Sequence, residues 1–394
     1  MNHEFPHMAH YLDYAATSAI RPKQVVDAVS EFLSDCGATP GRAAHSRALT
    51  AGRIALHCRQ HVAGLLGLSG DPGRIAFMPN ATYGLNAALA GTLRPGDTVV
   101  ISEYDHNSVR RPVHALAGSR GVVVRSICGS PDGAVDLTEV ERLLDGAKLL
   151  VVNEISNVLG TKLPLARLAR LAHEAGALVL VDAAQSAGHV PVNHGDDGAD
   201  MVAFTGHKGL LGPQGTGGLW IRDGVDVEPM VLGGTGGGDS RTVGMPASMP
   251  DRLEAGTVNG PGLAGLLAAC RFLEERGVAS IHEEISALKM RLRDGLREIS
   301  GVRVLSPAAP DGAAIVTITT DAMEAGTLAH RLDTEWGVMG RAGLHCAPVV
   351  HQMMGTSASG AFRLSLGWAS TVEDVDRAIV AVHALAKSPI VPVS

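Results

Sequence analysis

The first two thirds of the chain alternate between short apolar runs and longer stretches in which apolar residues recur every three or four positions. Short apolar runs predict buried strands, whereas the spacing of Val25, Val29 and Phe32 after Pro22 predicts an amphipathic helix. The predicted strands span residues 74–78, 98–101, 122–127, 149–154, 178–182, 201–205 and 218–221. Helical segments separate most of them, which is the pattern of a mainly parallel sheet with helices on both faces.

A smaller α/β unit is predicted in the last third of the chain. Two long helices, near 261–276 and 281–299, lead into it. The remaining predicted elements are strands near 302–305, 315–319 and 362–366 and helices near 324–336 and 372–385. A chain of 394 residues is expected to form two to three such units.

The glycine-rich tract at 231–238, Val-Leu-Gly-Gly-Thr-Gly-Gly-Gly, is the strongest local bias in composition. A dinucleotide-binding fingerprint needs a strand before it and a helix that opens on its last glycine. Met-Pro pairs at 245–246 and 249–250 follow instead. We therefore interpret the tract as a mobile loop, and we find no internal repeat.

Composition and charge exclude several classes of protein. The chain is 45% apolar with 48 glycines, six phenylalanines, three tryptophans and four tyrosines, which suits an α/β enzyme packed with Ala, Val and Leu. The net charge of −7 and the lack of a Lys/Arg block argue against nucleic acid or an anionic membrane as partner. No apolar run reaches the ~20 residues that span a bilayer. The N-terminus resembles no signal peptide, and five scattered cysteines form no CxxC pair, so we expect a cytoplasmic protein with reduced thiols and no metal site.

One lysine stands out because of its surroundings. Lys208 lies in a Gly-His-Lys-Gly turn directly after the predicted strand 201–205, and Asp182 ends the predicted strand 178–182. Ligands of parallel α/β sheets bind beyond the carboxyl ends of the strands, so we expect both side chains in one site. Pyridoxal 5'-phosphate (PLP) requires a lysine that forms a Schiff base and a carboxylate that keeps the pyridine nitrogen protonated. We therefore predict PLP as the cofactor.

Taken together, the motifs resemble the cysteine desulfurases and selenocysteine lyases, PLP enzymes of the class V aminotransferase group and fold type I. The resemblance runs from Tyr-Leu-Asp-Tyr-Ala-Ala-Thr at 11–17 to the final helix, with the motifs in the family's order. It implies a large PLP-binding domain, residues 18–260, whose mainly parallel seven-stranded sheet is flanked by helices. It also implies a smaller C-terminal α/β domain formed by 1–17 with 261–394, and a homodimer.

The resemblance implies which residues bind the cofactor phosphate. Ala81 and Thr82 precede a predicted helical run over 85–90, and N–H groups at a helix start, with the Thr82 hydroxyl, suit a dianion. Thr205 and His207 would add hydrogen bonds to the phosphate. A plain N-cap role for Thr82 is the alternative. Thr257 is implied to reach the phosphate of the partner subunit's cofactor.

The resemblance also implies which residues contact the ring. Asp182 would pair with the pyridine nitrogen, and Gln185 would reach the phenolic oxygen. His106 would stack on the ring face and assist proton transfer, while Lys208 would shuttle the substrate Cα proton. The alternative for His106 is an exposed residue at a helix start.

For the substrate, the resemblance implies that Arg363 binds the carboxylate, with Arg341 as the next candidate. Asn157 is implied to contact either an oxygen of the cofactor or the substrate carboxylate. A planar guanidinium suits this task because it forms two parallel hydrogen bonds.

Cys346 separates members of this family. It lies in Arg-Ala-Gly-Leu-His-Cys-Ala-Pro at 341–348, which resembles the sequence around the persulfide-forming cysteine of the desulfurases, in the short-loop branch that includes selenocysteine lyases. We expect a short exposed loop in which Arg341 and His345 lower the thiol pKa. The alternative is a buried, inert cysteine. That alternative is expected for the other cysteines, at positions 36, 58, 128 and 270.

The predicted function is PLP-dependent cysteine desulfuration, in which L-cysteine becomes L-alanine and the sulfur forms a persulfide on Cys346. A sulfur-acceptor protein is a further candidate partner. The alternatives are a selenocysteine lyase, a cysteine or cystine C–S lyase of the same fold, and a catalytically silent PLP-fold binding protein.

Overall fold

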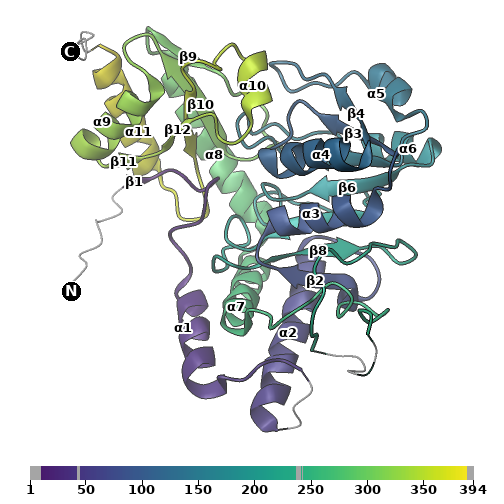
Figure 1. Cartoon of the computed structure of the whole chain (residues 1–394). Helices are drawn as coiled ribbons and strands as arrows, with labels where there is room; N and C mark the ends of the chain where they lie inside the picture. The colour runs from purple at the N-terminus through teal and green to yellow at the C-terminus, as the bar shows by residue number, and fades with distance from the viewer. Residues whose placement is uncertain (1–9, 42–44, 237–240, 242, 388–394) are drawn as a thin grey trace.

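The structure of the chain is a computed structural model that describes residues 10–41, 45–236, 241 and 243–387. It has two α/β units, of which the larger lies on the right of Figure 1 and the smaller at its upper left. The glycine-rich tract lies partly outside the described residues, so its interpretation as a mobile loop stays a prediction.

The large unit is built on a seven-stranded sheet with the order β2–β8–β7–β6–β5–β3–β4. Its strands are β2 (Ile75–Met78), β3 (Thr98–Ser102), β4 (Val123–Ile127), β5 (Leu149–Asn153), β6 (Leu178–Asp182), β7 (Met201–Thr205) and β8 (Gly217–Ile221). The five strands from β7 to β4 are parallel to one another, and β8 is antiparallel to both β7 and β2. The predicted mainly parallel sheet is thus confirmed, with every strand boundary within one residue of its predicted position.

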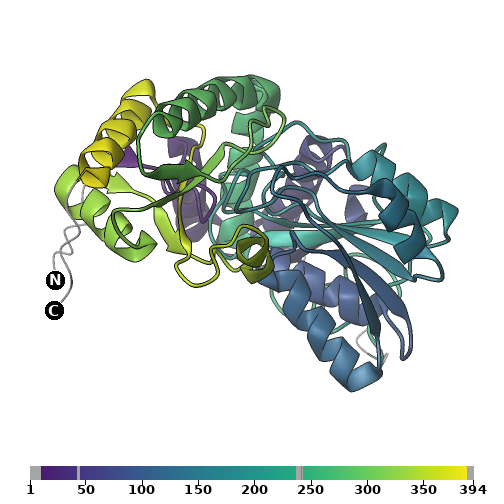
Figure 2. The same ribbon diagram turned by 90° about the horizontal axis from the view of Figure 1, so that it is seen from above.

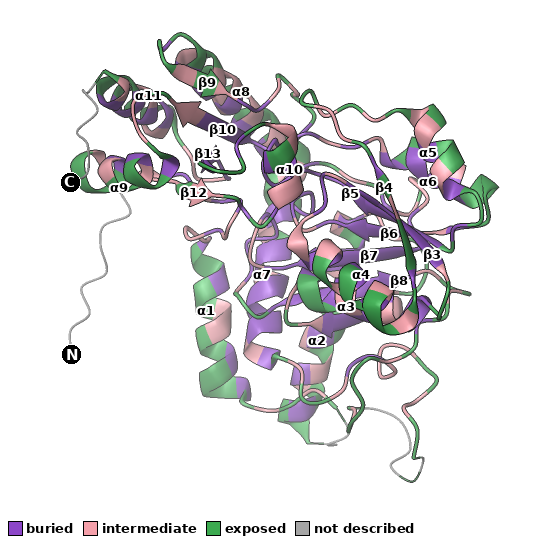
Figure 3. Ribbon diagram, turned by 45° about the horizontal axis from the view of Figure 1, so that its top comes forward, coloured by how far each residue is buried: buried purple, intermediate pink, exposed green. Residues whose placement is uncertain are grey.

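Helices cover both faces of this sheet because its strands are apolar on both sides. On one face Val151 and Leu180 pack with α3 (Ala81–Thr92) and α4 (Asn107–Arg120), which lie in front of the sheet in Figure 1. Alternate residues such as Val152 pack on the opposite face. That face carries α2 (Ser46–Leu65), α5 (Leu137–Leu144), α6 (Leu165–Glu174) and α7 (Gly260–Arg276). Figure 3 shows the central strands buried and the edge strand β4 exposed.

The small unit has a four-stranded antiparallel sheet with the order β12–β13–β10–β9. Its elements are β9 (Val302–Val304), β10 (Ile315–Thr320), β12 (Arg341–Gly343), β13 (Ala361–Ser365) and the helices α8 (Val278–Arg297), α9 (Ala325–Trp336), α10 (Pro348–Met353) and α11 (Val372–Ala386). The short strand β12 was missed because its three residues form no apolar run. Helix α10 lies between the two units in Figures 2 and 3.

The N-terminal segment joins the small unit. Strand β1 (His10–Tyr11) pairs in parallel with β11 (Val338–Met339), and Asp13 forms an isolated bridge with Ser365. The chain then crosses to α1 (Lys23–Glu31) in the large unit. Of the two long helices, α7 packs against α1 and α2 and α8 packs against α11, while the predicted domain boundary at residue 260 stays a prediction. None of the described helices is both long and apolar enough to cross a membrane.

Candidate active site

A cavity of about 230 Å³ lies at the carboxyl ends of β5, β6 and β7. This is the edge at which parallel α/β sheets bind ligands. The structure brings nine of the predicted site residues to its wall: Ala81, Thr82, His106, Asn157, Asp182, Gln185, Thr205, His207 and Lys208. Residues far apart in the sequence therefore share one site, as the strand pattern predicts.

Lys208 and Asp182 are ionisable residues in the lining of this cavity. Burial lowers the pKa of Lys208 to about 8, although the Asp182 carboxylate opposes that shift. Burial also raises the pKa of Asp182, whose Oδ1 accepts a hydrogen bond from Ala184 N at 3.0 Å. The glycines that flank Lys208 are required by close packing: a Cβ at Gly206 would meet the Thr216 hydroxyl, and one at Gly209 would lie 2.5 Å from Ala187 O.

The N-terminus of α3 forms the end of the cavity that suits an anion. Asn80 caps this helix by accepting a hydrogen bond from Tyr83 N at 3.2 Å, so the N-cap alternative for Thr82 is wrong. Nearby, the His207 ring contacts the Thr17 hydroxyl at 3.1 Å through Nδ1. Burial and the Lys208 charge lower the pKa of His207 to about 4, so this ring is neutral at pH 7.

His106 is the N-cap residue of α4 and lines the cavity. Its Nδ1 accepts a hydrogen bond from Ser108 N at 3.0 Å, which leaves the proton of the neutral ring on Nε2. Burial, followed by the charge of Lys208, lowers the pKa of His106 to about 4. The alternative of an exposed helix start is therefore only half right: the residue starts a helix but is half-buried in the cavity wall.

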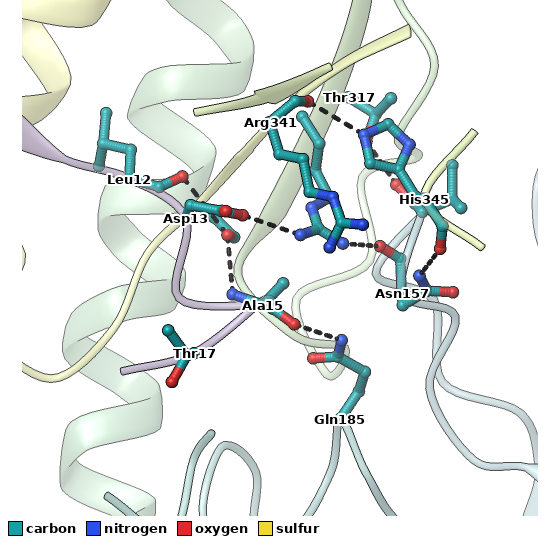
Figure 4. Close-up of polar contacts among 12 residues, drawn as sticks. Leu12, Asp13, Ala15, Thr17, Asn157, Gln185, Thr317, Arg341 and His345 are labelled. Carbon is teal, nitrogen blue, oxygen red and sulfur yellow. Dashed lines mark hydrogen bonds and ion pairs between the residues drawn. The ribbon is translucent and has the colours of Figure 1, made fainter. Parts of the chain in front are cut away.

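Two side-chain amides that line the cavity, those of Gln185 and Asn157, each donate a hydrogen bond to a distant segment while their amide oxygen remains without a partner among the described residues. Gln185 donates from Nε2 to Ala15 O at 2.9 Å, and Asn157 donates from Nδ2 to His345 O at 2.7 Å (Figure 4). Among the described residues, neither Gln185 Oε1 nor Asn157 Oδ1 has a hydrogen-bond partner, although both are buried.

Arg363 lies next to the cavity on β13 and is 1% exposed. Its guanidinium donates to Asn157 O at 2.9 Å and to Asp13 Oδ1 at 2.8 Å, while its Nε is buried without a partner among the described residues. Arg341 lies opposite Arg363 in the β12–β13 pair and is exposed. Neither arginine is part of the cavity lining.

Cys346 lies in an exposed turn between β12 and α10, so the buried alternative is wrong. The turn is closed by a hydrogen bond from Ala347 N to Leu344 O at 2.9 Å. Cys346 O accepts a hydrogen bond from Asn107 N at 2.8 Å. Asn107 is the first residue of α4 and directly follows His106 in the sequence, so this bond places the turn beside the start of α4.

Two expectations about this loop and the other cysteines are wrong. His345 was expected to help lower the pKa of the Cys346 thiol, but burial and the charge of Arg363 lower the pKa of His345 itself to about 3, so its neutral ring supplies no positive charge for this. Cys128 was expected to be buried, but it follows the edge strand β4 and is exposed. Cys36, Cys58 and Cys270 are buried as expected.

Thr257 does not reach the Lys208 cavity. It is exposed and contributes to a separate hollow of about 280 Å³, together with Thr216, Glu254 and Val258. Its implied role toward a second subunit stays a prediction.

Comparison with known proteins agrees with this geometry. The sequence model of the Aminotransferase class-V family matches residues 10–378. A "probable cysteine desulfurase" from Methanothermobacter thermautotrophicus is 35% identical over 93% of this chain and 92% of its own. A cysteine desulfurase from Haloferax volcanii is 33% identical, over 95% and 88% of the two chains.

Solved structures give the same result. The apo structure of a cysteine desulfurase from Thermococcus onnurineus superimposes with a TM-score of 0.89 at 33% identity, over 96% of this chain and 94% of the other. A cysteine desulfurase of Escherichia coli, in an S-sulfonic acid form, gives a TM-score of 0.86 at 28% identity over the same shares.

The chain belongs to the cysteine desulfurase family. Enzymes of this family depend on PLP, and the cavity fits that cofactor in its donors and acceptors. It offers a lysine and a buried carboxylate on adjacent strand ends, a helix N-terminus, and the buried Thr205 hydroxyl, which has no partner among the described residues.

Four residues of the wall were missed by the sequence analysis: Asn80, Ser108, Asn153 and Ala184. Asn153 was within reach of that analysis, because it ends the predicted strand that neighbours the one ending in Asp182. It donates to Tyr104 O, which anchors the segment before His106.

Proposed function

We propose that this protein is a PLP-dependent cysteine desulfurase, which converts L-cysteine to L-alanine and receives the sulfur as a persulfide on Cys346. The family supports the reaction class. The observation that carries the role of Cys346 is the attachment of its loop to the cavity wall. Asn107 N bonds Cys346 O and the Asn157 amide bonds His345 O, so an exposed thiol belongs to a turn fastened at the site.

PLP held at Lys208 would supply an electron sink that lets the substrate lose its Cα proton and its Cβ–S bond. Asp182 would pair with the pyridine nitrogen, and the N-terminus of α3 with Thr205 would hold the phosphate. A lysine with a pKa of about 8 exchanges protons readily near neutral pH, which suits Lys208 to carry the Cα proton. His106, neutral and protonated at Nε2, would pack on the ring.

Arg363 would hold the substrate carboxylate with the donors that its bonds to Asp13 and Asn157 leave free. The Cys346 thiolate then attacks the substrate sulfur. A sulfur–sulfur bond forms, the carbon–sulfur bond breaks, and its electron pair stays with the carbon skeleton. A proton completes alanine, and a thiol reductant or an acceptor protein takes the sulfur from Cys346.

The decisive experiment replaces the nucleophile. Cys346→Ala is expected to lose alanine production from cysteine while it keeps PLP and much of any activity on selenocysteine, because a selenol leaves more readily than a thiol. Cys128→Ala is the matched control, since Cys128 is also exposed. Alkylation of the wild type before reduction, followed by mass spectrometry, should place an extra sulfur on Cys346 alone.

Three other results would favour the alternative functions. Near wild-type desulfuration by Cys346→Ala would make this cysteine structural. Pyruvate in place of alanine would indicate a C–S lyase. A colourless protein that binds no PLP would indicate a silent member of the fold.

We also propose that the protein acts as a cytoplasmic homodimer, with Thr257 serving the phosphate site of the partner subunit. The support is the exposure of Thr257 in a hollow separate from the Lys208 cavity. Sedimentation at micromolar concentration should give a dimer, and an active monomer would contradict the proposal.

A further inference from the structure

The Cys346 loop contains an uncommon backbone conformation. Three non-glycine residues of the described chain have a positive φ, and two of them are consecutive: His345 at 50° and Cys346 at 57°. Left-handed residues with a Cβ cost about 1–2 kcal/mol each and persist only where their surroundings determine them. The nucleophile therefore lies in a turn that other groups must hold in place.

A buried chain of three side chains lies behind this turn. The His345 and His351 rings stack with centroids 5.3 Å apart, and His345 Nδ1 lies 3.2 Å from His351 Nε2. His351 Nδ1 lies 2.8 Å from the Thr356 hydroxyl, and Thr356 N donates to His351 O at 2.8 Å. The exposed fractions of His345, His351 and Thr356 are 3%, 0% and 2%.

The direction of every hydrogen bond in this chain follows from its last acceptor. His345 Nε2 lies 3.0 Å from Arg341 O, which only accepts, so His345 Nε2 carries a proton (Figure 4). In a neutral ring, Nδ1 of His345 is then an acceptor, and His351 Nε2 must donate to it. His351 Nδ1 is an acceptor in turn, and the Thr356 hydroxyl must donate to it. Burial lowers the pKa of both histidines, which keeps the two rings neutral.

We propose that His351 and Thr356 are positioning residues for Cys346: their hydrogen-bond chain fixes the His345 ring and thereby holds the left-handed turn that presents the thiol. The proposal rests on the proposed function of Cys346. Neither His351 nor Thr356 lines the Lys208 cavity as the structure describes it. The hydrogen-bonded route from them to the cavity runs through His345, whose carbonyl accepts from Asn157 in the cavity lining.

The test compares Thr356→Val with Thr356→Ser. Valine has nearly the shape of threonine but lacks the hydroxyl, so His351 Nδ1 loses its hydrogen-bond donor. The donor and acceptor roles of the His351 and His345 ring nitrogens are then no longer fixed by Thr356, whereas serine keeps the donor. We expect Thr356→Val to lower kcat for cysteine roughly tenfold with KM within about twofold, and Thr356→Ser to stay within about twofold of wild type. His351→Phe keeps a ring against His345 without hydrogen bonds and should lower kcat at least as much.

A second measurement does not depend on activity. Hydrogen exchange in a peptide spanning 341–350 should quicken severalfold in Thr356→Val but not in Thr356→Ser, while a peptide over β5 keeps its wild-type rate. Faster exchange in both peptides would indicate general destabilisation and overturn the proposal, as would wild-type kcat and exchange in Thr356→Val. A rise in KM with unchanged kcat would also overturn it. Desulfuration of cysteine by Cys346→Ala would instead refute the proposed function. The hydrogen-exchange result would still decide whether the hydrogen bonds among Thr356, His351 and His345 hold the turn.

Discussion

The proposed site has two walls that are built in different ways: the lining of the Lys208 cavity, which comes from the large unit, and the Cys346 turn of the small unit, which is hydrogen-bonded to it. In the large unit, Asp182 ends β6, Lys208 follows β7 and His106 caps the start of α4, so the hydrogen-bonded backbone of regular elements positions the side chains. In the small unit, Cys346 lies in a turn with two left-handed residues, held by single bonds such as that from Asn157 to His345 O, 188 residues apart. The first wall is rigid because of its secondary structure. The second depends on a few side chains, and individual substitutions should loosen it without unfolding the protein.

The largest expected effect lies in the rigid wall. Lys208→Ala should lose the covalent attachment of PLP and reduce desulfuration roughly 10⁴-fold or more. The reason is that Lys208 is the only lysine among the described residues that line the cavity with Asp182. The fold should persist, since Lys208 lies in a turn, and circular dichroism checks this. Borohydride reduction of the wild type followed by mass spectrometry should find the pyridoxyl group on Lys208, and its presence on another lysine would refute the assignment.

A smaller effect is expected where the two walls meet. Arg363→Ala should lower kcat/KM for cysteine by about 2–4 kcal/mol of transition-state binding, mainly through KM, because the carboxylate loses a charge-assisted partner. The visible spectrum of the bound cofactor should not change. Arg341→Ala is the control, since Arg341 is exposed on the neighbouring strand. If Arg341→Ala has the greater effect on KM, the carboxylate anchor is Arg341.

Asn157→Ala sharpens the comparison because it cuts the side-chain bond to the turn but keeps the backbone carbonyl that Arg363 uses. We expect kcat for cysteine to fall about fivefold to tenfold, the loss of one buried hydrogen bond. Asn153→Ala is matched to it, since Asn153 lines the same cavity but bonds Tyr104 O. A change in KM alone would mean that Asn157 binds substrate and does not support the turn.

The smallest effect concerns stability. His189 is buried, and burial followed by the Lys208 charge lowers its pKa to about 4, while an unfolded histidine titrates near 6.5. Between these values the unfolded chain binds more protons, so stability is fully present above pH 6.5 and falls as the pH drops toward 4. His106 and His207 act in the same direction. Calorimetry should show a Tm several degrees lower at pH 5 than at pH 7, and a weaker dependence in His189→Gln. Asp105 acts in the opposite direction, because burial raises its pKa to about 7. The decisive comparison is therefore between the two proteins: an equal pH dependence of Tm in wild type and His189→Gln would contradict the assignment for His189.

Much of the rigid wall was open to prediction from sequence. The apolar runs that end in Asp182 and precede Lys208 define strands, and parallel strands bring their carboxyl ends to one edge. The same reasoning extends to Asn153, which was missed because no motif marks it. By contrast, the strand β12 beside the Cys346 turn has only three residues and no apolar run, so its pairing with β13 gave no local signal.

The mainly parallel sheet, the strand-end pair of Lys208 and Asp182, and the family could all be predicted from the sequence, because they follow from local periodicity and from motifs in fixed order. By contrast, the pairing of Arg363 with Asp13, 350 residues away, and the burial of His345 as a neutral ring became known only from the packed structure. Burial and pairing depend on which segments pack together, and the charge of a histidine depends on both. The support of the Cys346 turn is therefore a property of the packed molecule.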